Sequence, residues 1–120
     1  ICLGMQLFME KSEEFGINEG LGLIKGCVNK ISSRENIILP NIGFYNPISE
    51  INKKDSKKWF YFIHSYKCVP EEKNDIKSFI FYNYIKVVSE IKKGNINGCQ
   101  FHPEKSHKSG FEFYKKFINE

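Results

Sequence analysis

Apolar and polar residues alternate at two different intervals along this chain. Between Met5 and Phe15, apolar residues mixed with charged ones follow the spacing of an amphipathic helix, and a second helix is predicted at residues 110–118. Runs rich in aromatic and β-branched residues instead predict strands. These strands cover residues 27–31, 59–64 and 78–85, with 87–91 as a continuation or a partner of the last one. The pattern predicts an α/β domain whose C-terminal helix packs on a sheet through Phe111, Phe113, Tyr114 and Phe117.

Turn-forming residues separate the predicted elements. They mark a glycine-rich turn at 20–26, a polar turn at 32–36, a loop at 40–47, a polar connection at 49–58 and a turn at 95–98. The last turn leads into a short strand that ends at Pro103, so His102 and Glu104 would emerge side by side where this strand ends. The sequence shows no internal repeat and no linker, and we expect residues 1–120 to belong to one domain.

Two short runs carry residues with catalytic chemistry. Cys2 lies in Ile1-Cys2-Leu3-Gly4-Met5-Gln6, where the small residue two positions after the thiol is typical of a strand that turns sharply into a helix. A thiol at a helix N-terminus has a lowered pKa. His102 and Glu104, in Gln100-Phe101-His102-Pro103-Glu104-Lys105-Ser106, supply a base and a carboxylate that orients it. A single cysteine is more often structural. The two runs together predict a triad of Cys2, His102 and Glu104.

Both runs resemble the two signatures of the class I glutamine amidotransferases. Within that superfamily, residues 11–14, 20–24, 40–44 and 62–66 are similar, in order, to segments of the glutaminase subunits of imidazole glycerol phosphate synthases. The resemblance implies a three-layer, flavodoxin-like α/β fold. It also implies that an N-terminal portion of the domain, with its first strands and a glycine-rich oxyanion loop, precedes Ile1. We therefore expect residues 1–120 to be the C-terminal portion of one domain and to be catalytically incomplete alone.

The resemblance further implies a reaction and a set of site residues. The Cys2 thiolate would attack the side-chain amide of glutamine, His102 would protonate the departing ammonia, and water would then release glutamate from a thioester. The backbone N–H of Leu3 matches an oxyanion donor. Four side chains match positions that contact the substrate: Gln6, Glu14, Ser65 and Tyr66. No cofactor and no metal are implied.

A partner protein is implied as well. In the resembled subunit, ammonia passes to a synthase (cyclase) subunit of a heterodimer in histidine biosynthesis, and Phe44 and Lys105 match positions that face this partner. Asn41 and Phe44 stand where the subunit has other residues, so amidotransferases of surface-sugar biosynthesis stay open as an alternative. A non-catalytic binding subunit and a cysteine peptidase are also open. The peptidase is disfavoured because the matched substrate positions suit a small amino acid.

Composition excludes several other classes. The 120 residues carry a formal net charge of +4, and the lysine cluster at 53–58 is explained better as a solvated connection than as a nucleic-acid site. The four cysteines lack the spacing of metal ligands. Cys27, Cys68 and Cys99 suit core positions in a protein of the reducing cytoplasm. No run approaches the ~20 apolar residues of a membrane span, so neither nucleic acid nor membrane is expected as a partner.

Overall fold

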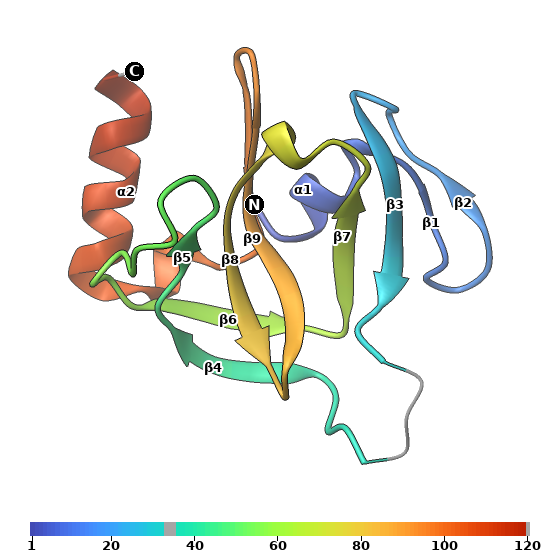
Figure 1. Ribbon diagram of the computed structural model, residues 1–120, viewed down its shortest axis with the longest axis horizontal. Coiled ribbons are helices and arrows are strands. Elements are labelled where there is room, and N and C mark those ends of the chain that lie inside the picture. The colour runs from blue at the N-terminus through green and yellow to red at the C-terminus, as the bar shows by residue number, and fades with distance from the viewer. Residues whose placement is uncertain (33–35, 120) are drawn as a thin grey trace.

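The computed structural model describes residues 1–32 and 36–119, which form three small sheets and a few short helices (Figure 1). The helices in this part of the chain are α1 (Leu3–Gln6), α2 (His107–Asn119) and the 3-10 helices η1 (Lys73–Asp75) and η2 (Pro103–Lys105). The α/β class is confirmed. The three-layer arrangement is not seen among the described residues, because only α2 is a long helix and the strands are divided among separate sheets.

The first sheet has the order β2-β1-β3-β7 and lies on the right of Figure 1. Its strands are β1 (Met9–Ser12), β2 (Asn18–Glu19), β3 (Ile24–Lys30) and β7 (Tyr66–Pro70). Only β1 and β3 pair in parallel; β2 and β7 are antiparallel to their neighbours. Gly26 has a φ of 125°, and a Cβ at this position would overlap the Val69 carbonyl oxygen. Glycine is therefore required where β3 meets β7.

The helix predicted between Met5 and Phe15 is wrong beyond Gln6, since β1 follows after a short turn. Two of the charged residues that suggested a polar helix face instead accept hydrogen bonds from the backbone of β3. Glu10 accepts a hydrogen bond from the Gly26 N–H at 2.8 Å, and Glu13 accepts one from the Lys30 N–H at 2.5 Å. These side chains hold the segment beside β3, and pairing between distant strands overrides the local helical pattern.

The second sheet is an antiparallel meander with the order β10-β9-β8-β5. Its strands are β5 (Ile48–Ser49), β8 (Ile76–Tyr82), β9 (Ile85–Lys93) and β10 (Ile96–Cys99). The predicted strand at 87–91 is thus the partner of the strand before it, and not its continuation. The turn predicted at 95–98 is wrong, because Gly94 makes the turn with a φ of 58° and residues 96–99 pair with β9.

The third sheet pairs β4 (Asn41–Tyr45) with β6 (Phe60–His64) along the lower edge of Figure 1. The aromatic strand at 59–64 is confirmed as β6. The loop predicted at 40–47 is wrong, because its central residues form β4 and bond to β6. The polar turn predicted at 32–36 falls mainly on residues 33–35, which lie outside the described residues.

Two apolar clusters fill the interior. Met5, Met9, Ile24 and Val28 are central to the first, and Phe60, Phe62 and Phe101 to the second. Helix α2 joins the second cluster through Phe113, whose ring centroid lies 5.2 Å from that of Phe101.

Three expected core positions are wrong. Phe111 and Phe117 remain 64% and 52% exposed, so only part of the predicted stripe on α2 packs on the core. Cys68 and Cys99 are buried as predicted, and this burial raises the pKa of each thiol to about 12. Cys27 is only half-buried.

No helix of the part of the chain described by the structure is long and apolar enough to cross a membrane.

Candidate active site

Cys2 lies directly before α1 and beside the end of β10. Its N–H donates to the Cys99 carbonyl at 2.7 Å, so Cys2 is attached to the end of β10. Its backbone has φ 47° and ψ −110°. A positive φ is uncommon for a residue other than glycine, and strained backbone of this kind concentrates at functional sites. The conformation is that expected of a nucleophile held on a tight turn before a helix.

The thiol of Cys2 is half-buried and accepts a hydrogen bond from the side-chain amide of Gln100, with 3.4 Å between Nε2 and Sγ. Burial raises the pKa of this thiol, although hydrogen bonds from the Leu3 backbone and from Gln100 act to lower it. The expected lowering by a helix N-terminus is therefore wrong. Helix α1 has only four residues, and the desolvation of the thiolate outweighs the favourable contacts.

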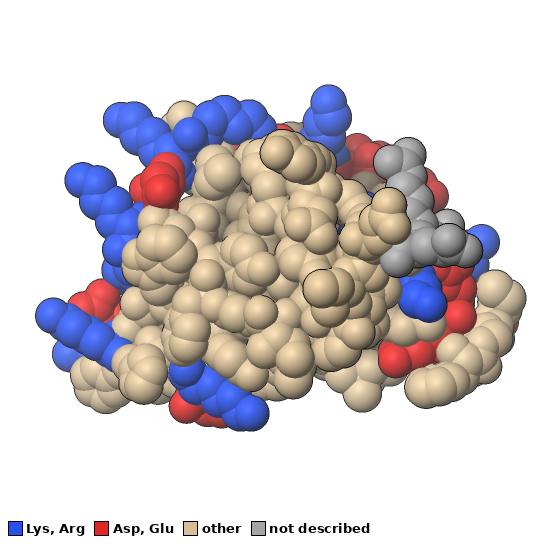
Figure 2. Space-filling view, turned by 90° about the horizontal axis from the view of Figure 1, so that it is seen from below, with Lys and Arg blue, Asp and Glu red and all other residues tan. Residues whose placement is uncertain are grey.

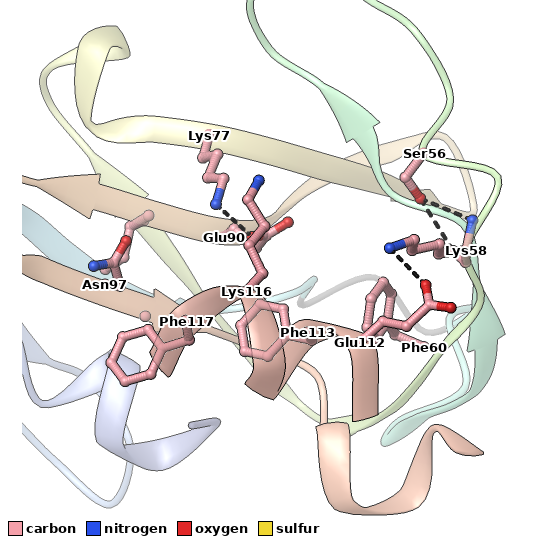
Figure 3. A pocket seen from close by; sticks show the side chains of 12 residues that line it. Ser56, Lys58, Phe60, Lys77, Glu90, Asn97, Glu112, Phe113, Lys116 and Phe117 are labelled. Carbon is pink, nitrogen blue, oxygen red and sulfur yellow. Dashed lines mark hydrogen bonds and ion pairs between the residues drawn. The ribbon is translucent and has the colours of Figure 1, made fainter. Parts of the chain in front are cut away.

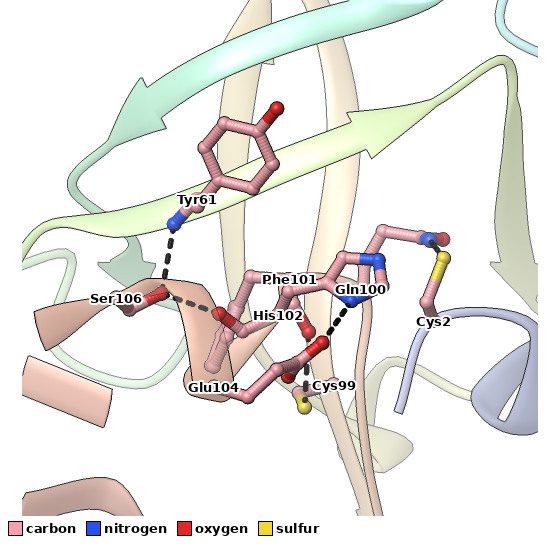
Figure 4. Close-up of polar contacts among 8 residues, drawn as sticks. All are labelled: Cys2, Tyr61, Cys99, Gln100, Phe101, His102, Glu104 and Ser106. Atoms are coloured by element: carbon pink, nitrogen blue, oxygen red, sulfur yellow. Dashed lines mark hydrogen bonds and ion pairs between the residues drawn. The ribbon is translucent and has the colours of Figure 1, made fainter. Parts of the chain in front are cut away.

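His102 and Glu104 form a close pair where the chain leaves β10. The Nδ1 atom of His102 donates to Oε1 of Glu104 at 2.5 Å, which leaves Nε2 to exchange a proton (Figure 4). Partial burial acts to raise the pKa of the Glu104 carboxyl, but the hydrogen bonds from His102 and from the Glu104 backbone, together with the charges of His102 and Lys105, outweigh it and lower the pKa overall. Glu104 is thus an ionised carboxylate that orients the imidazole.

The base follows the end of β10, to which the nucleophile is hydrogen-bonded, but the two residues are not bonded to each other. Cys2 is attached to Cys99, and three residues later the N–H of His102 donates to the Tyr61 carbonyl at 2.8 Å. Among the described residues, no hydrogen bond joins the Cys2 thiol to the His102 imidazole (Figure 4). Such bonds are often long without substrate and tighten in the complex. The hydrogen bond between His102 and Glu104 is therefore formed, whereas a contact between His102 and the Cys2 thiol is not.

Ser106 fixes the position of the His102 backbone, although the sequence analysis gave it no role. Its side chain is 2% exposed. The Oγ atom accepts a hydrogen bond from the Tyr61 N–H at 2.9 Å and donates one to the His102 carbonyl at 2.6 Å. Gly110 lets helix α2 lie directly against this segment, because a Cβ there would overlap the Pro103 carbonyl oxygen. The turn that carries His102 is thereby attached to both β6 and α2.

A cavity of about 330 Å³ opens beside α1, and three of the expected substrate positions line it. These are Leu3, Gln6 and Glu14; Lys11, Ser12 and Asn18 contribute polar groups next to them. Glu14 follows β1 in a turn and not on a helix. The Tyr66 carbonyl accepts a hydrogen bond from Gln6 at 3.2 Å, so Tyr66 lies close by. Ser65 is not among the residues that line the cavity, and its carbonyl accepts from the Ile31 N–H.

The two expected partner-facing residues, Phe44 and Lys105, both contact the ring of Tyr61. The ring of Phe44 is 44% exposed and contacts Tyr61 edge to face, with 5.4 Å between the ring centroids. Lys105 places its ammonium group 5.5 Å from the centroid of the same Tyr61 ring. Phe44 also stacks on His107. The underside of the molecule shows a broad face without charged side chains, with lysines gathered at its margin (Figure 2).

A second cavity, of about 230 Å³, lies between α2 and the strands β9 and β10 (Figure 3). Two ion pairs line it, Lys58 with Glu112 at 2.8 Å and Lys77 with Glu90 at 3.3 Å. Neither Cys2 nor His102 lines this space, and neither lines the cavity beside α1, although Leu3 of that cavity directly follows Cys2. Within the described residues there is also no group of three or more histidine, cysteine, aspartate or glutamate side chains that could hold a metal ion.

Comparison with known proteins identifies relatives over the whole chain. The family model described as "Glutamine amidotransferase class-I" matches residues 1–119. A protein of Chlorobaculum tepidum named imidazole glycerol phosphate synthase subunit HisH is 40% identical over 125 residues, which cover 98% of this chain and 60% of that protein. The protein of the same name from Prochlorococcus marinus is 39% identical over 119 residues, covering 92% of this chain and 54% of its own length. The chain thus spans little more than half the length of these curated relatives.

Proposed function

Because the chain belongs to the class I glutamine amidotransferase family, we propose that it carries a glutaminase triad of Cys2, His102 and Glu104. The observation that carries the proposal is the pairing of His102 with Glu104 on the same strand end to which the strained Cys2 turn is attached. A non-catalytic binding subunit would need neither a strained thiol nor an oriented imidazole. We also propose that residues 1–120 are the C-terminal portion of a single glutamine amidotransferase domain.

The proposed reaction is amide hydrolysis through a thioester. Because burial raises the pKa of the Cys2 thiol, we propose that the proton leaves as the sulfur attacks, and we assign its transfer to His102 as general base. The C–S bond forms, and the backbone N–H of Leu3 donates to the developing oxyanion. His102 then returns the proton to the departing nitrogen as the C–N bond breaks. Water, deprotonated by His102, attacks the thioester and releases glutamate and the free thiol.

The proposed substrate is glutamine, bound in the cavity beside α1. Its size suits an amino acid, and Glu14 offers a carboxylate that can pair with an α-amino group. Gln6 contributes an amide at the inner wall. Tyr66, attached to Gln6 through its carbonyl, and Ser65 before it complete the proposed contacts with the amino-acid end of the substrate.

We further propose that the ammonia serves a synthase (cyclase) subunit of a heterodimer in histidine biosynthesis. Support comes from the relatives in Chlorobaculum tepidum and Prochlorococcus marinus, both named as subunits of imidazole glycerol phosphate synthase. The proposed interface includes Phe44 and Lys105, which both contact the Tyr61 ring. All four cysteines are free thiols, as suits the reducing cytoplasm. Surface-sugar amidotransferases are the alternative, since they share the core motifs.

The glutaminase is tested by measuring glutamate released from glutamine by the purified full-length protein that contains residues 1–120, and by two variants of it. Cys2→Ala removes the nucleophile and is expected to reduce release to a few per cent or less. Cys27→Ala removes the other thiol that is only half-buried and is the matched control, with release expected to stay near that of the parent. Release that survives Cys2→Ala would overturn the assignment of the nucleophile.

The interface is tested by titrating the synthase subunit of a histidine pathway with the protein and with Phe44→Ala. An aromatic anchor at an interface is typically worth ~2 kcal/mol or more, so affinity is expected to fall by at least about 30-fold. Phe111→Ala is the matched control, because Phe111 is an exposed phenylalanine on α2. Equal affinities of the two variants would show that the Phe44 face is not the interface and would favour the surface-sugar alternative.

A further inference from the structure

We propose that Gln100 is a positioning residue for the nucleophile: its side-chain amide, oriented by Gln6, directs the sulfur of Cys2 and stabilises the thiolate. The inference rests on the proposed function in that Cys2 is taken as the reactive thiol. The two amides and the thiol form one continuous chain of contacts. Gln6 Nε2 lies 3.1 Å from Gln100 Oε1, and Gln100 Nε2 lies 3.4 Å from Cys2 Sγ.

The surroundings determine which way each amide faces. A carbonyl oxygen only accepts hydrogen bonds, and the Tyr66 carbonyl takes one from Gln6 at 3.2 Å. Gln6 must therefore turn its NH₂ group inward, and the second hydrogen of that group is given to the oxygen of Gln100. With its oxygen held there, Gln100 can present only its own NH₂ group to the sulfur. The donor that faces Cys2 is thus set by a backbone carbonyl on β7.

Further buried groups hold that carbonyl in place. His64 lies 2.8 Å from the Tyr66 carbonyl through Nδ1, so Nδ1 carries the hydrogen. Its Nε2 then accepts from the amide of Asn41 at 3.2 Å, and the oxygen of that amide accepts from the Tyr45 hydroxyl at 2.7 Å. Burial lowers the pKa of His64 and keeps the ring neutral, as this pattern requires. In this pattern the donor and the acceptor of every hydrogen bond are fixed.

Burial makes the network rigid. Gln100 and Asn41 are fully buried, and Gln6 and His64 are 7% and 6% exposed. Water does not compete for these groups, and breaking any one bond leaves a buried polar atom without a partner. The sequence already contained Gln100, in the same run as His102, but gave it no role. A buried glutamine between two apolar residues of a strand end must find partners, and here one partner is the nucleophile.

The chemical consequence follows from the charge on sulfur. A donated N–H is attracted more strongly by a thiolate than by a thiol, so the contact favours the ionised form and opposes the effect of burial. The other titratable side chains around the sulfur are Glu104 on η2 and the thiols of Cys68 and Cys99. All three stay unchanged in the variants below, so a change in thiol ionisation reports on the amides.

The test is the rate at which iodoacetamide alkylates Cys2, followed by mass spectrometry of the Cys2 peptide across the pH range in which thiols ionise. Gln100→Met keeps the length of the side chain and removes the donor. The midpoint of its profile is expected to rise by about one pH unit, with alkylation on the order of ten-fold slower below the midpoint. Gln6→Met is expected to shift the midpoint in the same direction by less. The double variant should match Gln100→Met, because Gln6 acts only through Gln100.

Two controls separate positioning from general loosening. Ser78→Ala removes a buried hydroxyl that bonds to Ser89 and Glu90 on the second sheet, and it should leave the Cys2 profile unchanged. The alkylation of Cys27 is measured in the same samples as an internal control. An unchanged midpoint in Gln100→Met would overturn the proposal, as would an equal shift at Cys27 or in Ser78→Ala. A shifted midpoint supports it even where glutamate release fails, and an unshifted one overturns it even where release succeeds, so the two proposals are tested separately.

Discussion

Replacing Ser106 by alanine is expected to loosen the segment that carries the catalytic base. The Ser106 side chain is 2% exposed, and its Oγ is bonded both to the Tyr61 N–H and to the His102 carbonyl. The carbonyl of Tyr61 accepts from the His102 N–H, so both backbone groups of Tyr61 face this segment, away from β4. Because Ser106 is buried, alanine at this position leaves the Tyr61 N–H without its acceptor.

The magnitude follows from what the substitution leaves unpaired. A buried N–H without an acceptor costs about 1–3 kcal/mol. The His102 carbonyl loses less, because the Lys105 N–H still donates to it at 3.0 Å. We expect a loss of about 2 kcal/mol in the free energy of unfolding, against a typical total of about 5–15 kcal/mol. Turnover should fall as well, by up to on the order of 10²-fold, because small displacements of a catalytic group are costly.

Urea unfolding of the parent, Ser106→Ala and Ser109→Ala measures the first quantity, and steady-state glutamate release measures the second. Ser109 lies one turn away on α2, and its hydroxyl has no hydrogen bond with the described residues, so its removal controls for the loss of a hydroxyl. If Ser106→Ala proved as stable and as active as Ser109→Ala, Ser106 would not hold the base in position.

Two further predictions concern the carboxylate. Glu104→Gln should keep the fold by circular dichroism but lower kcat by up to roughly 10⁴-fold with little change in KM, since a misoriented imidazole affects turnover more than binding; an unaltered kcat in steady-state assays would make Glu104 an ordinary surface carboxylate. The lowered pKa of Glu104 means that its stabilising effect is present above the ordinary pKa of a carboxyl and is lost as pH falls through the lowered value. In urea unfolding at a series of acidic pH values, the parent and Glu104→Gln should therefore converge in stability as pH falls. A difference in stability that widened as pH falls would contradict a lowered pKa of Glu104.

Local patterns predicted those strands that carry their own signal. The aromatic run at 59–64 and the apolar runs at 78–85 and 87–91 favour strands, and strands cover most of each run. The prediction of one strand over 78–85 is wrong only at Asn83 and Tyr84, which form the turn between β8 and β9. Strand β1 was missed because its acidic residues have helical spacing, while their use as acceptors for β3 depends on a segment far along the chain. Strand β4 was missed because Pro40, Gly43 and Pro47 are typical of loops. Its pairing with β6 is invisible to a local pattern.

The candidate site divides in the same way. Cys2, His102 and Glu104 stand out because their chemistry is rare and their short runs are distinctive. Gln100 and Ser106 lie in one of those runs but have no reactive group, so nothing in the sequence gave them a role. Their contacts reach Cys2 and Tyr61, at 98 and 45 residues' separation. The signal that was available is their setting: polar side chains beside buried apolar ones need hydrogen-bond partners.

The most direct test of the proposed chemistry is to stop the reaction with acid during glutamine turnover and to locate the covalent intermediate by mass spectrometry. The proposed mechanism predicts a glutamyl thioester on the peptide that contains Cys2, absent without glutamine and absent in Cys2→Ala. A glutamyl group found on Cys27 instead, or glutamate formed at an undiminished rate by Cys2→Ala, would contradict it.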